Sequence, residues 1–398
     1  MFPEFYQKVL RAHLSESQYL TLQLLVLLLQ SHHQVSLGRL ATVFPQPIKY
    51  ESRIRNLQRF LILPQLSLKA LWFPIVKYWL AQEFKGRHQN RAQRRYFKKL
   101  RHPKSGALIV AIDRTQWKDR NLFMVSIVWG KHAFPLYWEI LDKRGNSDLL
   151  TQTRLLTIAL KLLKPYPVVV LGDREFHSPK LAAWLDERGI SFAFRQRKSA
   201  FIQDCDSEYQ ALKTMGFQPG MSKFFSGIFC NKEEHLGPFN LAAYWKRKYR
   251  GKGPKEPWYI LTNLPTLKQA LDLYRSRWGI EMMFKDCKSG GYNLEDTLVN
   301  TERFLALVLV IAIAYSLATC QGLLLKQLGV QVYATRLQED RSSHPRHSDF
   351  GIGLYGYLWR YAMEVWSDLA EALMRLKPHK RYYFRRGLNA LSLFQSAL

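Results

Sequence analysis

The chain has few cysteines, and none is placed for a zinc site or a disulfide framework. The four cysteines of this 398-residue chain stand at positions 205, 230, 287 and 320, with no Cys-x-x-Cys pair and no histidine at zinc-finger spacing. The sequence also contains no internal repeat and no low-complexity tract. Its first residues, Met-Phe-Pro-Glu-Phe-Tyr, lack the basic and then apolar pattern of a signal peptide, so we expect a cytoplasmic protein associated with the nucleoid.

Acidic residues are scarce. The chain has 31 Asp and Glu against 59 Lys and Arg, which gives a formal net charge of +28. Because such an excess opposes compaction by self-repulsion, it indicates a polyanionic partner, and DNA or RNA is the first candidate. The basic residues are densest at 85–104, where no acid occurs. We predict a basic linker over residues 85–106 that follows a DNA backbone, although a solvated linker has the same composition.

One apolar run is long enough to cross a membrane. Residues 304–325 carry no formal charge, and about 20 apolar residues suffice to span a bilayer. The run contains Tyr315, Ser316, Thr319 and Gln321, and no second span accompanies it. These features favour a buried core helix over a membrane helix, so we expect no membrane partner.

The first 84 residues are predicted to form an all-helical module. Short helical patterns lead to a turn at residues 45–47, and a basic helical pattern follows over residues 49–61. That pattern leaves three arginines on the side away from its apolar residues: Arg53, Arg55 and Arg59. A helix, a turn and a basic helix are the outline of helix-turn-helix DNA-binding modules, although unrelated helical bundles share it. We expect these arginines to contact DNA.

The middle of the chain alternates strand and helix signals. Apolar or β-branched runs predict strands at residues 107–112, 122–129, 133–141, 167–171 and 191–197, and helical spacing predicts helices at 148–163 and 179–188. The order β-β-β-α-β-α-β is the ribonuclease H-like arrangement. In that arrangement the first and fourth strands are neighbours at the centre of the sheet.

The predicted fold class is therefore α/β, with a ribonuclease H-like core that a β-rich insertion interrupts. We assign residues 107–197 to the first part of the core, 198–257 to the insertion and 258–330 to the second part. The helical module of residues 1–84 precedes the core, and a basic C-terminal region follows it at residues 331–398.

Three carboxylates end or follow these elements. Asp113 stands in I-V-A-I-D-R-T-Q-W, Asp173 in V-V-V-L-G-D-R-E-F, and Glu281 in a helix predicted over residues 267–288. Phosphodiester cleavage with two metal ions needs carboxylates that hold the ions about 3.5–4 Å apart. Oxygen ligands of this kind favour Mg²⁺ or Mn²⁺. An isolated Asp at a strand end is usually a cap or turn residue, but three acids in matching elements predict a metal-dependent catalytic site.

The predicted helix also carries phosphate-binding groups beside its carboxylate. Steps of four and seven residues return to nearly the same face, so Tyr274, Arg277, Glu281 and Lys288 are predicted to share one side. Arg277 and Glu281 also fit a plain surface ion pair at i, i+4 spacing. The two upstream Asp motifs favour the catalytic interpretation.

These motifs resemble the DDE transposases of bacterial insertion sequences, in particular the insertion-sequence-four type with its Y-R-E-K signature. Tyr274, Arg277, Glu281 and Lys288 reproduce the spacing of that signature, and the resemblance covers residues 107–325. The first Asp motif departs from the family pattern, because Arg114 stands where Gly, Ser or Ala is usual.

The resemblance implies a cut-and-paste DNA transposase. Asp113, Asp173 and Glu281 would be the catalytic and metal-binding triad for Mg²⁺ or Mn²⁺. Tyr274, Arg277 and Lys288 would hold phosphates near the transposon end, and Trp258 would stack on a flipped base during hairpin formation. Transposon ends and target DNA would be the partners, bound by a homodimer. Two alternatives are a ribonuclease H-fold nuclease without strand transfer and a DNA-binding regulator without catalysis.

Overall fold

The structure is a computed structural model that describes residues 2–84, 106–117, 119–142, 144–204, 207–247, 253–337 and 346–396. The predicted basic linker at 85–106 lies outside these residues except for Gly106. The chain divides into two compact units. Unit 1 combines Met1–Tyr96 with Phe284–Leu398, and unit 2 is Phe97–Met283. The boundary between the units falls inside helix α10 (Trp278–Cys287).

Unit 1 is helical. Its elements include α1 (Glu4–His13), α2 (Glu16–His32), α3 (Leu37–Val43), α4 (Tyr50–Phe60), the π-helix η1 (Leu68–Trp72), α5 (Phe73–Phe84), α11 (Thr301–Gln327), α12 (Asp349–Val365), α13 (Ser367–Arg375) and α14 (Arg381–Ser396). Short 3-10 turns occur at η4 (Leu294–Asp296), η5 (Gln331–Tyr333) and η6 (Pro378–Lys380). The caps fit the sequence, since Ser15 and Gln18 form a reciprocal capping box at the start of α2.

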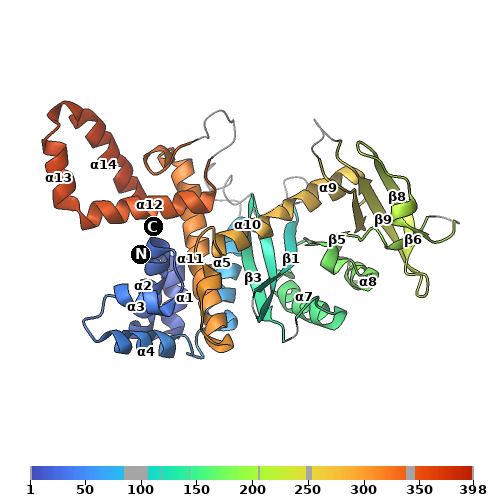
Figure 1. Ribbon diagram of the computed structural model, residues 1–398, viewed down its shortest axis with the longest axis horizontal. Helices are drawn as coiled ribbons and strands as arrows, with labels where there is room; N and C mark the ends of the chain where they lie inside the picture. The colour runs from blue at the N-terminus through green and yellow to red at the C-terminus, as the bar shows by residue number, and fades with distance from the viewer. Residues whose placement is uncertain are drawn as a thin grey trace. The chain divides into compact units, whose positions relative to one another are not determined.

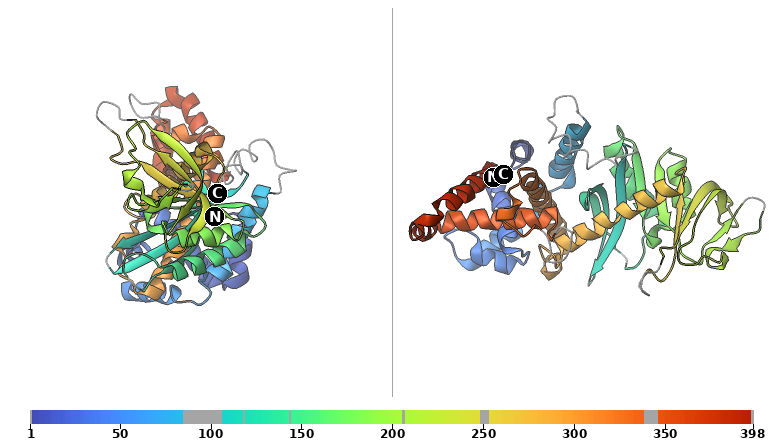
Figure 2. Two further views of the ribbon diagram at one scale, coloured as in Figure 1. Left: turned by 90° about the vertical axis from the view of Figure 1, so that its right-hand side faces the viewer. Right: turned by 90° about the horizontal axis from the view of Figure 1, so that it is seen from above.

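Helix α11 is the centre of unit 1. It is the predicted apolar helix, and its most apolar 18-residue window is 83% buried. It packs against α12 and α2 (Figures 1 and 2). A helix that is apolar on all sides must be covered on all sides, so the N-terminal helices share a core with the C-terminal ones. The hydroxyl of Tyr6 in α1 bonds to Ser316 in α11 at 2.8 Å, which satisfies two polar groups inside this core.

Unit 2 is built on one mixed sheet. Its strands are β1 (Leu108–Trp117), β2 (Arg120–Trp129), β3 (His132–Ile140), β4 (Val168–Gly172), β5 (Ser191–Arg195), β6 (Phe201–Gln203), β7 (Gln210–Ala211), β8 (Ser222–Cys230), β9 (Leu236–Tyr244) and β10 (Trp258–Thr262). Among the described residues these strands form a ten-stranded sheet in the order β3-β2-β1-β4-β5-β10-β9-β8-β6-β7. The predicted strand and helix order is confirmed, and β1 is the parallel neighbour of β4 as predicted.

Helices pack against this sheet and bury its apolar side chains. Helix α7 (Leu149–Leu163) contacts β2 and β3, α8 (Pro179–Asp186) contacts β5, and α9 (Leu267–Ser276) contacts β5, β9 and β10 (Figure 1). The 3-10 turns η2 (Arg174–Phe176) and η3 (Leu212–Thr214) complete the unit. Fully buried leucines of α7 such as Leu155 and Leu163 each contribute about 1.5–3 kcal/mol through burial.

The residues predicted as a β-rich insertion, 198–257, contain β6 to β9. These strands do not form a sheet of their own, because β10 pairs on one side with β5 and on the other with β9. The segment therefore continues the main sheet.

Candidate active site

Two of the three predicted acids directly follow the parallel ladder between β1 and β4. The β1–β4 register ends with Ile112 paired to Gly172, so Asp113 and Asp173 are the next residues on their two chains. Asp173 follows the end of β4, whereas Asp113 lies inside β1, which extends beyond the predicted residues 107–112 and continues to Trp117 in its pairing with β2. Gly172 is required there. A Cβ on this residue would lie 2.7 Å from the Cβ of Phe176 and 3.0 Å from the Phe194 ring. The absent side chain lets η2 fold back against the strand directly after Asp173.

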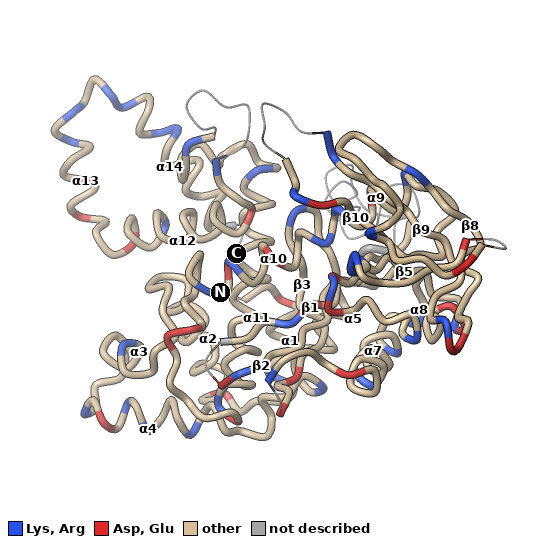
Figure 3. Tube along the Cα trace, turned by 45° about the vertical axis from the view of Figure 1, so that its right-hand side comes forward, with Lys and Arg blue, Asp and Glu red and all other residues tan. Residues whose placement is uncertain are grey.

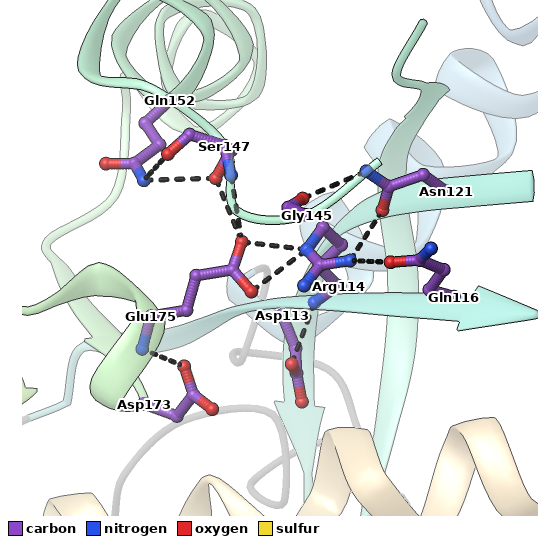
Figure 4. A network of polar contacts seen from close by, with 9 residues as sticks. All are labelled: Asp113, Arg114, Gln116, Asn121, Gly145, Ser147, Gln152, Asp173 and Glu175. Carbon is purple, nitrogen blue, oxygen red and sulfur yellow. Dashed lines mark hydrogen bonds and ion pairs between the residues drawn. The ribbon is translucent and has the colours of Figure 1, made fainter. Parts of the chain in front are cut away.

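Backbone amides hold one oxygen of each aspartate. The Arg114 amide donates to Asp113 Oδ1 at 2.7 Å, and the Glu175 amide donates to Asp173 Oδ1 at 2.8 Å (Figure 4). Asp173 is also the N-cap residue of η2. These bonds orient both carboxylates in the folded chain.

Glu281 lies in the first turn of α10. The helix predicted as continuous over residues 267–288 is two helices, α9 and α10, that meet at Arg277. The amides of Arg277 and Ile280 bond three residues back, to Tyr274 and Arg277 at 3.1 and 3.0 Å, so the chain tightens there instead of running as a regular α-helix. The start of α10 lies close to the β2–β3 turn, because a Cβ on Gly279 would stand 2.5 Å from the carbonyl oxygen of His132.

Arg277 connects the acids. Its Nη1 lies 3.4 Å from Asp113 Oδ2, and its Nη2 bonds to Glu281 Oε1. The Arg277 and Asp113 side chains are 14% and 16% exposed, while Glu281 is 35% exposed. Arg277 and Glu281 are therefore not a plain surface ion pair, because the guanidinium of Arg277 also contacts Asp113, which lies on strand β1.

Burial and charge perturb these groups. Burial first, then the nearby Asp173 and Glu281, raise the pKa of Asp113 to about 7, although Arg277 and the Arg114 amide oppose the shift. Burial lowers the pKa of Arg277, but Tyr274 and the three acids outweigh it and the net pKa is raised. Arg277 therefore stays charged among crowded carboxylates, which is the electrostatic pattern of a functional site.

Aromatic residues flank Arg277. Its guanidinium lies 5.9 Å from the ring centre of buried Tyr274, and that ring meets Trp258 edge to face at 5.2 Å. The Arg195 guanidinium lies 6.0 Å from the Trp258 ring. Burial raises the pKa of Tyr274, and the cations Arg277 and Arg195 oppose the rise. Unit 2 thus brings together five of the predicted site residues: Asp113, Glu281, Arg277, Tyr274 and Trp258, with Asp173 at the adjacent strand end.

The remaining predicted residues lie in unit 1. Lys288 follows the end of α10 and pairs with Glu295 at 2.9 Å. Arg53, Arg55 and Arg59 lie on α4, where Figure 3 shows a series of basic positions. Arg55 and Arg59 are exposed, and Arg53 is half-buried with a 3.5 Å bond from its Nη1 to the Phe44 carbonyl. The roles of these four residues in DNA binding stay predictions.

The sequence analysis did not single out several polar residues beside Asp173. Arg174 pairs with Glu256, which also lies 3.5 Å from Arg195. Arg174 lines a cavity of about 230 Å³ that also contains three lysines and three aromatic side chains, Lys198, Lys213, Lys255, Phe217, Trp245 and Tyr259. Arg174 and Glu175 belong to the G-D-R-E-F motif, so their position in the sequence next to Asp173 could have indicated that they lie at the site. Glu175 forms a separate buried pair with Arg114 (Figure 4).

Comparisons with known proteins indicate the family of the chain. The family described as "Transposase DDE domain" matches residues 104–317, which is more than half of the chain and includes all three acids. No curated protein matches the sequence. Among solved structures, the chain is similar to the piggyBac transposase in a cryo-EM structure of its synaptic complex with hairpin DNA. The identity is 13%, the TM-score is 0.41, and the match covers 91% of this chain and 77% of that chain. The chain belongs to the transposase DDE-domain family, whose activity is DNA transposition.

Proposed function

We propose that this protein is a cut-and-paste transposase in which Asp113, Asp173 and Glu281 form the catalytic triad. The observation that carries the proposal is the meeting of the acids: the β1–β4 register places the two aspartates side by side, and Arg277 joins Asp113 to Glu281. One site of this kind serves both hydrolysis at the transposon end and attack by the freed 3′-hydroxyl, because all these steps are in-line displacements at phosphorus.

The donor set fits Mg²⁺ or Mn²⁺. All three side chains offer carboxylate oxygens, which these hard cations prefer. The Arg277 guanidinium between Asp113 and Glu281 indicates that this position attracts positive charge. In the described part of the chain no three His, Cys, Asp or Glu side chains are already gathered for one ion, so Glu281 would have to leave Arg277 to join the aspartates. A bound ion would activate the nucleophile and stabilise the leaving oxygen.

The surrounding cations and aromatic rings would bind the DNA strand. Arg277 and Tyr274 would contact phosphates once the carboxylates have other partners. Lys288 would also bind phosphate, as the Y-R-E-K signature of the insertion-sequence-four type implies. Trp258, held between Tyr274 and Arg195, would stack on a flipped base. The basic cavity beside Arg174 adds positive charge next to Asp173.

The rest of the chain would support DNA binding. We assign residues 107–197 and 258–330 to a ribonuclease H-like core on the basis of the strand order β3-β2-β1-β4-β5. The helical module at 1–84 would contact transposon ends through the exposed face of α4, and a homodimer would hold two ends together. The excess of 28 positive charges suits a protein that stays on the nucleoid.

A strand-transfer assay tests the proposal. Purified full-length protein is mixed with Mg²⁺ or Mn²⁺, DNA carrying the ends of the element and a supercoiled target plasmid. We expect cleaved ends, hairpin intermediates and joined products, all lost with EDTA. Trp258→Ala should reduce hairpins about tenfold while the first nick persists, since base stacking contributes about 1–3 kcal/mol. Cleavage with no joined product would instead establish a nuclease, and DNA binding with no cleavage would establish a regulator.

A further inference from the structure

A partly buried ion pair lies directly behind the two aspartates. Arg114 follows Asp113 on β1, and Glu175 is the second residue after Asp173. Because consecutive strand residues point to opposite faces, the side chains of Asp113 and Arg114 leave β1 in opposite directions. In Figure 4 the carboxylates of Asp113 and Asp173 lie on one side of the β1 ribbon, and the pair of Arg114 with Glu175 lies on the other.

The pair is anchored by several elements. Arg114 Nε lies 2.9 Å from both carboxylate oxygens of Glu175, and the two side chains are only 13% and 11% exposed. Arg114 Nη1 also donates to Gln116 at 3.0 Å and to Asn121 of β2 at 2.8 Å. A buried charge pair is stable only when its remaining donors and acceptors are satisfied, and these contacts supply part of that requirement.

Glu175 is held from a second direction. Its Oε1 accepts bonds from the Ser147 amide at 3.2 Å and the Ser147 hydroxyl at 3.1 Å. Gln152 of α7 in turn donates to the Ser147 carbonyl and hydroxyl at 3.1 and 3.0 Å. The pair therefore joins β1, β2, the loop before α7 and α7 itself (Figure 4).

The same two residues also hold the aspartates through their backbone. The Arg114 amide bonds Asp113 Oδ1, and the Glu175 amide bonds Asp173 Oδ1. The ion pair restrains the side chains of Arg114 and Glu175. It thereby also restrains the backbone amides of these two residues, which bond the aspartates. One oxygen of each aspartate is thus bonded to the backbone of a residue of the pair, and the Oδ2 of Asp113 contacts Arg277 in the site.

We propose that Arg114 and Glu175 are positioning residues that set the separation and orientation of Asp113 and Asp173. Glu175 is then not a fourth metal ligand, since its carboxylate is committed to Arg114 and Ser147 on the opposite side of β1. The inference rests on the proposed metal-dependent function.

Direct Mn²⁺ binding to the full-length protein, followed by electron paramagnetic resonance without DNA, tests the inference. Removal of a group that orients metal ligands commonly weakens metal affinity about 10–100-fold. We expect a loss of this size for Arg114→Met and for Glu175→Gln, and a similar, non-additive loss for the double variant Arg114→Met/Glu175→Met. If Glu175 were itself a ligand, Arg114→Met would free its carboxylate and Mn²⁺ affinity would be kept or increased. That result overturns the proposal.

A matched control separates this pair from ion pairs in general. Arg154 and Glu139 form a double hydrogen bond of 2.9 and 2.7 Å in the same unit but with Arg154 55% exposed. Arg154→Met should leave Mn²⁺ affinity unchanged; an equal loss there contradicts a specific role for Arg114. Thermal unfolding confirms that each variant is folded, and if Arg114→Met does not fold, Glu175→Gln and Arg114→Lys decide the question, with retained Mn²⁺ affinity in both overturning the proposal.

The two proposals fail in different ways. If the unmodified protein binds no Mn²⁺ and cuts no DNA, the proposed function fails. If it binds and cuts, but the Arg114 and Glu175 variants bind Mn²⁺ as well as the unmodified protein does, the positioning role alone fails. In the supporting case, cleavage by the variants should also need about tenfold or more Mn²⁺ for half-maximal rate while DNA affinity stays the same.

Discussion

The two aspartates and the glutamate of the site are held in different ways. Asp113 and Asp173 directly follow the paired residues of the β1–β4 ladder, each has an oxygen bonded to a backbone amide, and a partly buried ion pair lies behind them. Glu281 comes from the first turn of a helix that begins at an irregular junction, and Arg277 holds its carboxylate. Two acids are therefore built into the sheet, and the third depends on one charged partner and on the seating of α10.

This difference assigns separate tasks to the two sides of the site. The sheet provides a fixed reference, because the strand ladder, the two backbone amides and the ion pair all help to hold the aspartates. The helix provides the adjustable ligand, because Glu281 needs only to exchange Arg277 for another cation. Rigid elements hold catalytic groups in a precise geometry. The exchange of Arg277 for a cation at Glu281 would need only a small movement of the backbone.

The largest effect should come from removing an acid on either side. Glu281→Ala should reduce DNA cleavage on the order of a thousandfold or more, as loss of one member of a catalytic set commonly does. DNA affinity, measured by fluorescence anisotropy, should be nearly unchanged. Asp113→Ala should match it in the same cleavage assay. Cleavage retained by Glu281→Ala would show that the helix does not supply the third acid.

Asp113, on the fixed side, should make the stability of the protein depend on pH. The folded pKa of Asp113, about 7, exceeds the roughly 3.9 of an unfolded aspartate, so the folded state binds more protons between these values. Stability should fall as pH rises from about 4 to 7, by up to about 4 kcal/mol from this group. Asp113→Asn should remove the loss. The free energy of unfolding is measured by urea unfolding in EDTA at pH 4.5 and at pH 8. Relative to the unmodified protein, the variant should be more stable at pH 8 than at pH 4.5. An equal difference in stability at the two pH values would contradict this prediction.

The position of the start of α10 against His132 should have a large effect on the rate of DNA cleavage. Gly279→Ala places a Cβ 2.5 Å from the His132 carbonyl oxygen, so the helix must shift. A displacement of about 1 Å at a catalytic group can reduce the rate about a hundredfold, and we expect a loss of that size in DNA cleavage. Gly387→Ala in α14, where the nearest atom is 4.0 Å away, is the control and should keep full activity. Equal activity in both variants would remove the seating argument.

The smallest effect should come from changing the length of the adjustable ligand. Glu281→Asp retracts the carboxylate by one methylene, and we expect only about a tenfold loss of cleavage because movement of the helix start can compensate in part. Asp113→Glu should cost at least about a hundredfold, since its neighbours are packed and bonded. Cleavage rates at saturating Mn²⁺ measure both. A larger loss for Glu281→Asp than for Asp113→Glu would reverse the comparison.

The sequence predicted the fixed side of the site well. The runs that end at Asp113 and Asp173 are continuous and apolar, which is typical of buried parallel strands, and the order of elements predicts that β1 and β4 pair. Because parallel neighbours end at the same edge, the meeting of the two aspartates followed. The apolar pattern of α11 similarly predicted a core helix.

The adjustable side was less predictable. The helical pattern of residues 267–288 led to the expectation of one continuous helix. The chain instead has an irregular junction at Arg277, two residues before Gly279, whose backbone closely approaches His132. A contact with a residue so distant in the sequence cannot be read from the helical pattern. The pairing of Arg114 with Glu175 also depends on three-dimensional packing, since the turn after β4 must return residue 175 behind β1. Short alternating runs at 198–257 indicated strands but not that β10 would join them to the main sheet.

The contact between Gly279 and His132 has a consequence for how copies of such a gene decay. A copy can keep all three acids and every phosphate-binding residue and still lose most of its cleavage activity, because any side chain at position 279 meets the backbone of another element. Loss of this glycine would therefore mark a weakened copy. A survey that counts only acids would mistake such a copy for a fully active one.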